Sequence, residues 1–281
     1  MNVLERIRWE IGASISIARR YMRIYYIRPG TIMFGLMFPL FMFLSFAVGR
    51  RIPASMLISS LISITLLFSS SSVGPMILPM ERRLKTIERL LVAPISFYSI
   101  LLGVILCSMV YSISISIVPV FIGLLFLGVE VVDLLSLAVG IFFSSMCFAS
   151  LGMMFASYPT EYPGNVTMAL NFLRLPLLFI SGVFIPLENL PDWQRTIAFI
   201  SPLTYCNDLM RRSVGGGYLN PVLDAAALLA FTILFLVAGM KIHVMFSDTA
   251  STSRPVRRMP EYGRRRHGPR GRPGSPGLGP I

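Results

Sequence analysis

Apolar runs close to 20 residues long recur along most of this chain, and they constrain its fold more than any other feature. A helix of about 20 residues crosses the roughly 30 Å hydrocarbon core of a bilayer. Only 14% of the 281 residues are charged, against about 25% in a soluble domain, so polar surface is too scarce to cover a globule. The alternating short strands of a membrane barrel are not seen. The sequence therefore predicts an all-α membrane protein.

Six transmembrane helices fit the apolar runs. We place them near residues 31–49, 54–79, 98–127, 134–157, 166–184 and 222–246. The stretch 1–29 instead repeats apolar side chains at steps of three and four, with its arginines mostly off that stripe. We expect it to form an amphipathic helix in the membrane interface, ahead of a six-span domain over residues 30–248.

Residues 249–281 form a third region of different composition. Arg, Pro and Gly dominate it, so it cannot bury enough apolar surface to order itself, and we expect a disordered cytoplasmic tail. Its basicity suits contact with anionic lipid or nucleic acid, or it is a solvated tail that enforces topology. We favour the second interpretation and expect no nucleic-acid partner.

The charged side chains orient the predicted spans. Of the 25 Lys and Arg residues, 19 fall in segments on the side of the N-terminus and five in loops on the other side. Cytoplasmic loops carry an excess of Lys and Arg, so we expect a multi-pass protein of the cell membrane with both termini in the cytoplasm. Arg50 and Arg51 lie in a predicted outer loop, where the rule expects few basic residues, so they disagree locally with this orientation.

Several kinds of chemistry lack their sequence motifs. Cys107, Cys147 and Cys206 are isolated, and no Cys/His cluster has metal-ligand spacing, so no metal site is expected. No GxxxxGK[ST] loop occurs, so we expect no ATP binding by this chain. Nothing supports a Ser/His/Asp set for nucleophilic catalysis. We therefore predict neither a cofactor nor an enzymatic reaction for the chain itself.

A charged stretch between the second and third spans is the first candidate site. Its charges alternate with apolar residues at helical spacing, and a helix of this type can dock in a groove of a soluble partner. The alternative is a plain charged loop between two spans. The stretch comprises Glu81, Arg82, Arg83, Leu84, Lys85, Thr86, Ile87, Glu88, Arg89 and Leu90.

A second candidate follows the fifth span. Pro191 and Pro202 each stand where a short helix can begin, and Ser201 can cap the second of these helices. We expect helices over 191–200 and 202–212 that form a hairpin dipping into the outer membrane surface. Glu188 is either a gate contact or a solvated loop carboxylate. The candidate residues are Ser181, Gly182, Pro186, Glu188, Pro191, Trp193, Pro202 and Tyr205.

Polar residues inside the spans form a third group. A charge such as that of Arg174 is costly in a bilayer, so we expect it to contact an anionic headgroup or a dimer interface, or to snorkel to the inner interface. Asn171 and Ser181 can line a path between protomers. Serines in the second, third and fourth spans serve either close helix packing or a polar lining, and we favour packing. They include Ser59, Ser63, Ser108, Ser112, Ser116, Ser144 and Ser145.

Two of these segments resemble one known family. The run Glu81-Arg82 followed by Thr86-Ile87-Glu88-Arg89-Leu90-Leu91-Val92-Ala93-Pro94 resembles the cytoplasmic loop of permease subunits of ABC type-2 exporters. The run from Phe179 to Glu188, with Leu190-Pro191, Trp193 and Ser201-Pro202-Leu203-Thr204-Tyr205, resembles the fifth span and outer hairpin of that family. The resemblance covers residues 1 to about 248 and is greatest to drug-resistance and nodulation-factor permeases.

This resemblance implies a working assembly. Residues 81–90 would be the coupling helix that docks on a separate ATP-binding subunit, which would bind ATP and Mg. Two permease copies would pair, as a homodimer or with a paralogue, and re-entrant helices over 186–212 would close the outer gate. The implied function is export of an amphipathic substrate (a drug, a lipid or a lipid-linked glycan) by alternating access.

Two other functions compete with this one. A non-transport scaffold or enzyme subunit would depend on no ATPase. A passive channel would need a ring of polar residues along a pore, and no such ring is visible in the sequence.

Overall fold

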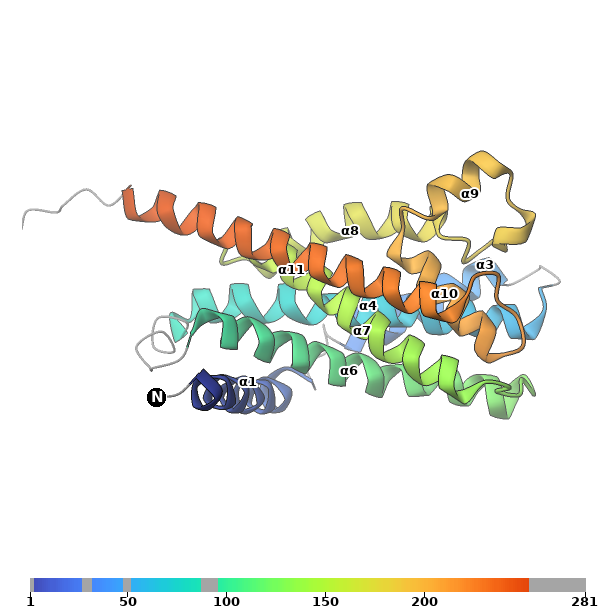
Figure 1. Cartoon of the computed structure of the whole chain (residues 1–281), viewed down its shortest axis with the longest axis horizontal. Coiled ribbons are helices and arrows are strands. Elements are labelled where there is room, and N and C mark those ends of the chain that lie inside the picture. Colours follow the sequence, from blue (N-terminus) through green and yellow to red (C-terminus); the bar gives the residue numbers. More distant parts are fainter. Residues whose placement is uncertain (1–2, 27–31, 48–51, 87–95, 253–281) are drawn as a thin grey trace, which may run out of the picture.

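The computed structural model describes residues 3–26, 32–47, 52–86 and 96–252. Within these residues every regular element is helical, and the long helices run side by side as a bundle (Figure 1). The predicted all-α class is confirmed for this part of the chain.

Among the described residues, four helices are long and apolar enough to cross a membrane. They are α4 (Ala54–Arg83), α6 (Phe97–Phe126), α7 (Leu134–Ala156) and α11 (Pro221–Thr252). The first is buried along most of its length, since α6, α7 and α8 (Pro163–Ile180) all pack on it. At 1.5 Å per residue its 30 residues extend about 45 Å, which exceeds the thickness of a hydrocarbon core.

The other two predicted spans take shorter forms. The run predicted at 31–49 contains a π-helical turn, Met33–Met37, and α3 (Phe38–Ala47), while residues 48–51 lie outside the described part. The run predicted at 166–184 is α8, which carries Arg174. Neither is among the four helices that satisfy both length and apolarity. The count of six spans therefore remains a prediction.

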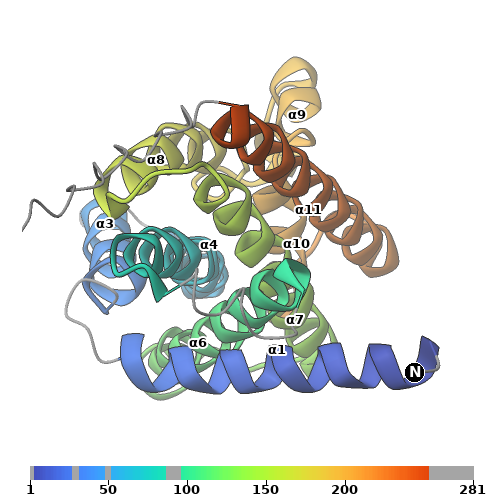
Figure 2. The ribbon, with the colours of Figure 1, turned by 90° about the vertical axis from the view of Figure 1, so that its left-hand side faces the viewer.

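Helix α1 (Val3–Tyr25) crosses the end of the bundle nearly at right angles to the other helices (Figures 1 and 2). Ile17, Ala18 and Tyr21 are buried on the side that packs on α6, whereas Trp9 and Ile15 on other sides are 56% exposed. A β-carbon at Gly103 of α6 would stand only 2.7 Å from Ile17 Cγ2, so this glycine permits the crossing. We call this the α1 end of the bundle.

The opposite end carries a compact arrangement of short helices over residues 181–213. This segment was predicted as an outer hairpin, and we refer to it as the outer hairpin, although its re-entrant form and its side of the membrane remain predictions. After α8 the chain forms a 3-10 turn (Leu187–Asn189), α9 (Asp192–Ala198) and α10 (Pro202–Ser213) (Figure 1). Pro202 begins α10 as predicted, but Ser201 does not cap it with its side chain. The Ser201 hydroxyl instead donates to the Leu177 carbonyl at 3.3 Å, which joins the hairpin to α8.

Helix α11 reaches further than its apolar run. It continues to Thr252, so residues 249–252, which we assigned to a disordered tail, are helical. The remainder of that predicted tail, residues 253–281, lies outside the described residues, as do 1–2 and 27–29 of the predicted interfacial helix.

Serines inside the bundle support the packing interpretation. All seven that we singled out are buried. Five of them, Ser59, Ser63, Ser108, Ser116 and Ser145, donate to a carbonyl of their own helix and so need no solvent or ligand partner. Small side chains of this kind let helix backbones approach closely in a membrane.

Candidate functional site

The charged stretch 81–90 divides where the fold bends. Glu81, Arg82 and Arg83 form the last turn of α4 rather than the start of a separate helix. Lys85 then adopts a left-handed conformation, φ 54°, which ends α4. The predicted positions Ile87, Glu88, Arg89 and Leu90 lie outside the described residues.

Glu81 faces into the protein. Its side chain is only 2% exposed, and its Oε2 lies 3.4 Å from Nη2 of Arg20 on α1. The Thr86 hydroxyl donates to the same oxygen at 2.5 Å. The ion pair between Arg20 and Glu81 joins α1 to the end of α4, so a displacement of the charged stretch would move both helices.

Arg82 also faces inward, toward the end of α7. Its Nη1 donates to the Ala156 carbonyl at 3.0 Å and to the Tyr158 carbonyl at 2.5 Å, and its Nη2 donates to the Ser157 carbonyl at 3.3 Å. Ala156 and Ser157 close α7, and the last turn of a helix leaves its carbonyls without intrahelical partners. The Tyr158 carbonyl lies just beyond the helix and also accepts from Thr160 N. A cation at this position also suits the negative end of the α7 dipole.

Arg83, Leu84 and Lys85 point the other way. All three side chains are exposed, Leu84 by 58%. We call these three residues the docking face. An exposed leucine between two cations offers both an apolar anchor and charge to a partner, whereas Glu81 and Arg82 are committed to contacts within this chain.

Arg174 is fully buried in the middle of the bundle. Its Nε donates to Ser71 Oγ at 3.0 Å, its Nη2 to Ser72 Oγ at 3.1 Å and its Nη1 to Asn171 Oδ1 at 3.1 Å. The guanidinium also lies 5.1 Å from the ring centroid of Phe68. The serines stand near the midpoint of α4, so Arg174 does not snorkel to the end of the bundle.

The serines that hold Arg174 belong to one turn of α4 whose hydroxyls reach three neighbouring helices. Ser69 donates to Ser112 Oγ of α6 at 2.9 Å, and Ser70 donates to the Ser145 carbonyl of α7 at 2.5 Å. Ser71 and Ser72 accept from α8. The partners of Arg174 are therefore neutral, and no acidic side chain is among the contacts found in the described chain.

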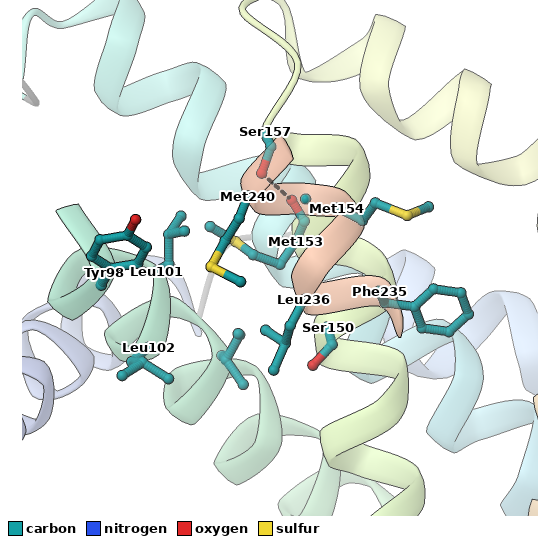
Figure 3. A pocket seen from close by; sticks show the side chains of 12 residues that line it. Tyr98, Leu101, Leu102, Ser150, Met153, Met154, Ser157, Phe235, Leu236 and Met240 are labelled. Atoms are coloured by element: carbon teal, nitrogen blue, oxygen red, sulfur yellow. Dashed lines mark hydrogen bonds between the residues drawn. The ribbon is translucent and has the colours of Figure 1, made fainter. Parts of the chain in front are cut away.

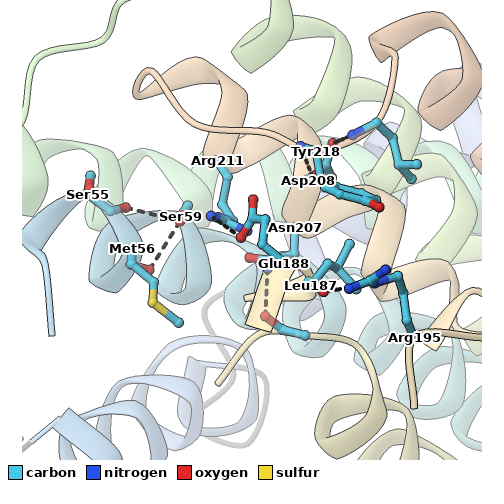
Figure 4. Close-up of polar contacts among 12 residues, drawn as sticks. Ser55, Met56, Ser59, Leu187, Glu188, Arg195, Asn207, Asp208, Arg211 and Tyr218 are labelled. Carbon is cyan, nitrogen blue, oxygen red and sulfur yellow. Dashed lines mark hydrogen bonds and ion pairs between the residues drawn. The ribbon is translucent and has the colours of Figure 1, made fainter. Parts of the chain in front are cut away.

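The outer hairpin is tied together by its arginines (Figure 4). Arg195 donates to the carbonyls of Leu187 at 3.1 Å and Leu190 at 3.0 Å, which fixes the turn before α9. Arg211 of α10 pairs with Glu188 at 3.2 Å. Glu188 is thus an ion-pair partner inside the hairpin, not only a solvated carboxylate.

Contacts with α4 position the hairpin on the bundle. The Ser60 hydroxyl donates to the Val183 carbonyl at 2.7 Å. Asn207 donates to the Gly182 carbonyl at 3.3 Å and accepts from Ser63 Oγ at 3.3 Å. Gly182 has φ +73°, a conformation that side chains other than glycine rarely adopt.

The remaining predicted hairpin residues lie in the same region. The Ser181 hydroxyl donates to the Leu178 carbonyl at 2.9 Å, and Pro186 and Pro191 immediately precede the 3-10 turn and α9. The Tyr205 hydroxyl donates to the Phe199 carbonyl at 3.0 Å. Trp193 is 65% exposed and lines a hollow of about 380 Å³ between α9 and the end of α8.

Apolar hollows also open toward the α1 end. One of about 210 Å³ lies between α6, α7 and α11 and is lined by Tyr98, Met153, Leu236 and neighbouring apolar side chains (Figure 3). Another of about 430 Å³ is lined by Phe155, Val166 and Ile242, among others. Such linings suit acyl chains or other apolar groups, with few polar atoms to fix orientation.

The sequence did not reveal which residues contact Glu81 and Arg174. Arg20 looked like one of several interfacial arginines, and Ser71 and Ser72 like packing serines. Their roles depend on contacts between residues far apart in the chain. The described residues contain no cluster of His, Cys, Asp and Glu that could hold a metal ion.

Two comparisons with known proteins bear on these sites. The family model for the ABC-2 type transporter matches residues 13–214, a range that includes the docking face, Arg174 and the hairpin. A protein of Cyanophora paradoxa named "Putative transport permease ycf38" is 31% identical over 151 residues. That match covers 51% of this chain and 50% of the relative, so it spans about half the length of each.

Proposed function

Because this chain belongs to the ABC-2 type transporter family, we propose that it is the transmembrane permease subunit of an ATP-driven exporter of amphipathic molecules. ATP would be bound and hydrolysed, with Mg, by a separate ATP-binding subunit. A second permease copy, identical or paralogous, would complete the transmembrane part in the cell membrane. The α1 end would face the cytoplasm and the outer hairpin would face outward.

The observation that carries this proposal is the continuity of α4. A single helix runs from the hairpin contact at Ser60 to the docking face at Arg83. Its two ends are fixed to other elements, by Val183 at one end and by Arg20 and the end of α7 at the other. Pro75 and Pro79 each remove one backbone hydrogen bond, but α4 stays helical through both of them. A continuous helix held in this way can carry a displacement of the docking face to the outer hairpin.

The proposed cycle follows from these contacts. Closure of the ATP-binding subunits would move the docking face, and α1, α4 and α7 would move with it because Glu81 and Arg82 bind them. The outer hairpin would then separate from the same segment of the second permease copy and open the substrate path to the outside. This is a rigid-body rearrangement about an interface, a common form of switching transition.

The apolar hollows support an amphipathic substrate. Their linings offer apolar contacts to a drug or lipid tail. Arg174 lines neither hollow; it is fully buried and carries a positive charge whose partners in the described chain are neutral. A buried charge in a bilayer is a candidate functional group by its cost alone. We propose that Arg174 and Asn171 lie along the path between protomers.

Transport in proteoliposomes tests this function. The permease would be reconstituted with its ATP-binding subunit, and extrusion of a fluorescent lipid analogue would be followed after ATP addition. A complex whose ATP-binding subunit carries a hydrolysis-dead Walker B substitution is the control. We expect ATP-dependent extrusion with the intact subunit and none with the control. Equal extrusion in both would favour a passive or scaffold role.

A further inference from the structure

A buried acidic residue lies where α10 meets the first turn of α11. Asp224 is 0% exposed, and neither of its carboxyl oxygens has a hydrogen-bond partner in the described residues. A buried carboxylate without a hydrogen bond is strongly disfavoured, because it has lost the solvation of water without replacement. The functions derived above do not use this group.

A second carboxyl group faces it. Asp208 of α10 is 1% exposed and lies within hydrogen-bonding reach of Asp224. Its two oxygens already accept from backbone amides, from Tyr218 N at 2.7 Å and from Leu219 N at 2.9 Å (Figure 4). Two carboxylates cannot hydrogen-bond to one another unless one of them carries a proton.

One cation of the described chain, Arg212, acts on this pair. Arg212 acts on Asp224 through its charge, but its Nη2 donates to the Leu219 carbonyl and its Nε reaches no partner in the described chain. Tyr205 and Cys206 are the other titratable groups of α10 near Asp224. At the start of α7, Asp133 acts on Arg212, and hydrogen bonds from Ser136 lower the pKa of Asp133.

We propose that Asp224 is a proton-binding site, occupied at neutral pH and shared with Asp208. The Asp208 oxygens already accept from two backbone amides, so the proton would lie on Asp224, whose O–H would donate a hydrogen bond to Asp208. A metal ion would need more ligands than the described residues bring to one place. The proton comes from the aqueous phase at the hairpin end and returns to it.

This site has a direct connection to the outer hairpin. Asp208 holds the loop that joins α10 to α11, through Tyr218 and Leu219. Loss of the proton would leave two negative charges side by side and weaken that hold. Resting on the proposed function, the proton site would therefore link opening of the hairpin to the pH of the outer phase.

Infrared spectroscopy of the purified full-length chain in detergent tests the site itself. A protonated carboxylic acid gives a carbonyl stretch above the amide I band. We expect such a band at about pH 7, where an ordinary aspartate is ionised. It should be absent from Asp224→Asn, shifted in Asp224→Glu and unchanged in Glu130→Gln, which removes an exposed carboxyl from the loop between α6 and α7.

Three outcomes would overturn the proposal. The first is the absence of the band from the wild type at every pH that the folded protein tolerates. The second is a band that persists unchanged in both Asp224 variants. The third is a band that disappears when sodium replaces choline at constant pH, which would assign the site to a metal cation. Because wild type alone is titrated, misfolding of a variant does not remove the test.

Transport then tests the link to the hairpin. In proteoliposomes with the ATP-binding subunit, we expect the wild-type rate to change severalfold with outer pH, and Asp224→Asn to lose that dependence while Glu130→Gln retains it. A pH dependence that survives in Asp224→Asn would overturn the link. If no ATP-driven transport occurs at all, the proposed exporter function fails, and the infrared band still decides the proton site.

Discussion

Gly152 of α7 lies directly against the backbone of Ser71 of α4. A β-carbon at Gly152 would stand 2.3 Å from the Ser71 carbonyl oxygen, closer than real β-carbons approach any atom. The same turn of α4 holds Arg174, so the close approach of α7 fixes the turn whose hydroxyls position the buried guanidinium.

Replacing Gly152 by alanine should therefore separate α4 from α7. The added methyl group would clash with the Ser71 backbone, which cannot move aside as a flexible side chain can. We therefore expect the free energy of unfolding to fall by about 1–3 kcal/mol. Thermal unfolding of the detergent-purified protein measures it. Gly164→Ala is the matched control, because a β-carbon there would meet nothing within 4 Å. Equal unfolding temperatures for the two variants would show that the helices can adjust.

Two adjacent arginines offer a sharper comparison. Arg82→Ala removes three hydrogen bonds to carbonyls at the end of α7, and we expect it to cost about 1.5–3 kcal/mol. Arg83→Ala removes an exposed side chain and should stay within about 0.5 kcal/mol of the wild type. Thermal unfolding distinguishes them. A reversed order would mean that the inward and outward roles at the end of α4 are misassigned.

Arg174→Met should keep the fold and impair transport. The substitution removes a buried charge, and replacing buried charges with apolar side chains is often neutral or stabilising. Ser71 and Ser72 are not left without partners, since their hydroxyls donate to the carbonyls of Leu67 and Phe68. Unfolding temperature and transport rate are measured on the same preparation. A strongly destabilised variant would instead give Arg174 a structural role.

The turn before α9 should depend on the guanidinium of Arg195. Lysine cannot reach the Leu187 and Leu190 carbonyls together, so Arg195→Lys should loosen residues 186–191. Limited proteolysis from the hairpin side measures this, with an expected severalfold faster cleavage. Asp192→Asn is the control, because that carboxylate is 98% exposed and its surface pair contributes at most about 1 kcal/mol. Equal cleavage of both variants would contradict the role of Arg195.

The lengths of the apolar runs and the positions of prolines predicted much of this fold. The apolar runs at 98–127 and 134–157 correspond to α6 and α7 within one residue, and Pro202 marks the start of α10. These helices could be predicted because the length of an apolar run and the position of a proline determine the structure of the segment in which they occur, without contacts from elsewhere in the chain. Helix α4 continues four residues beyond the predicted end of the second span, where Arg20 and the end of α7 contact Glu81 and Arg82.

The polar contacts of the site could not be predicted in the same way. Arg174 stood out in the sequence as a costly charge, but its serine partners lie about 100 positions earlier in the chain. Asp224 stood at the start of an apolar run, where an acidic residue ordinarily complements the helix dipole. Only the packing of α10 on α11 brings it to Asp208.

The central claim is that the docking face binds an ATP-binding subunit. Co-purification in detergent with co-expressed ATP-binding cassette proteins of the same organism tests it, comparing wild type with Arg83→Glu/Lys85→Glu. Lys241→Glu is the control, a charge reversal at an exposed position of α11, next to Met240, which lines the hollow between α6, α7 and α11. We predict a stable complex with ATPase activity for wild type and control, and at least a tenfold loss of bound ATPase, about 1.4 kcal/mol, for the double reversal. A folded wild-type permease that binds no ATPase, or a double reversal that binds it as well as wild type, would contradict the account.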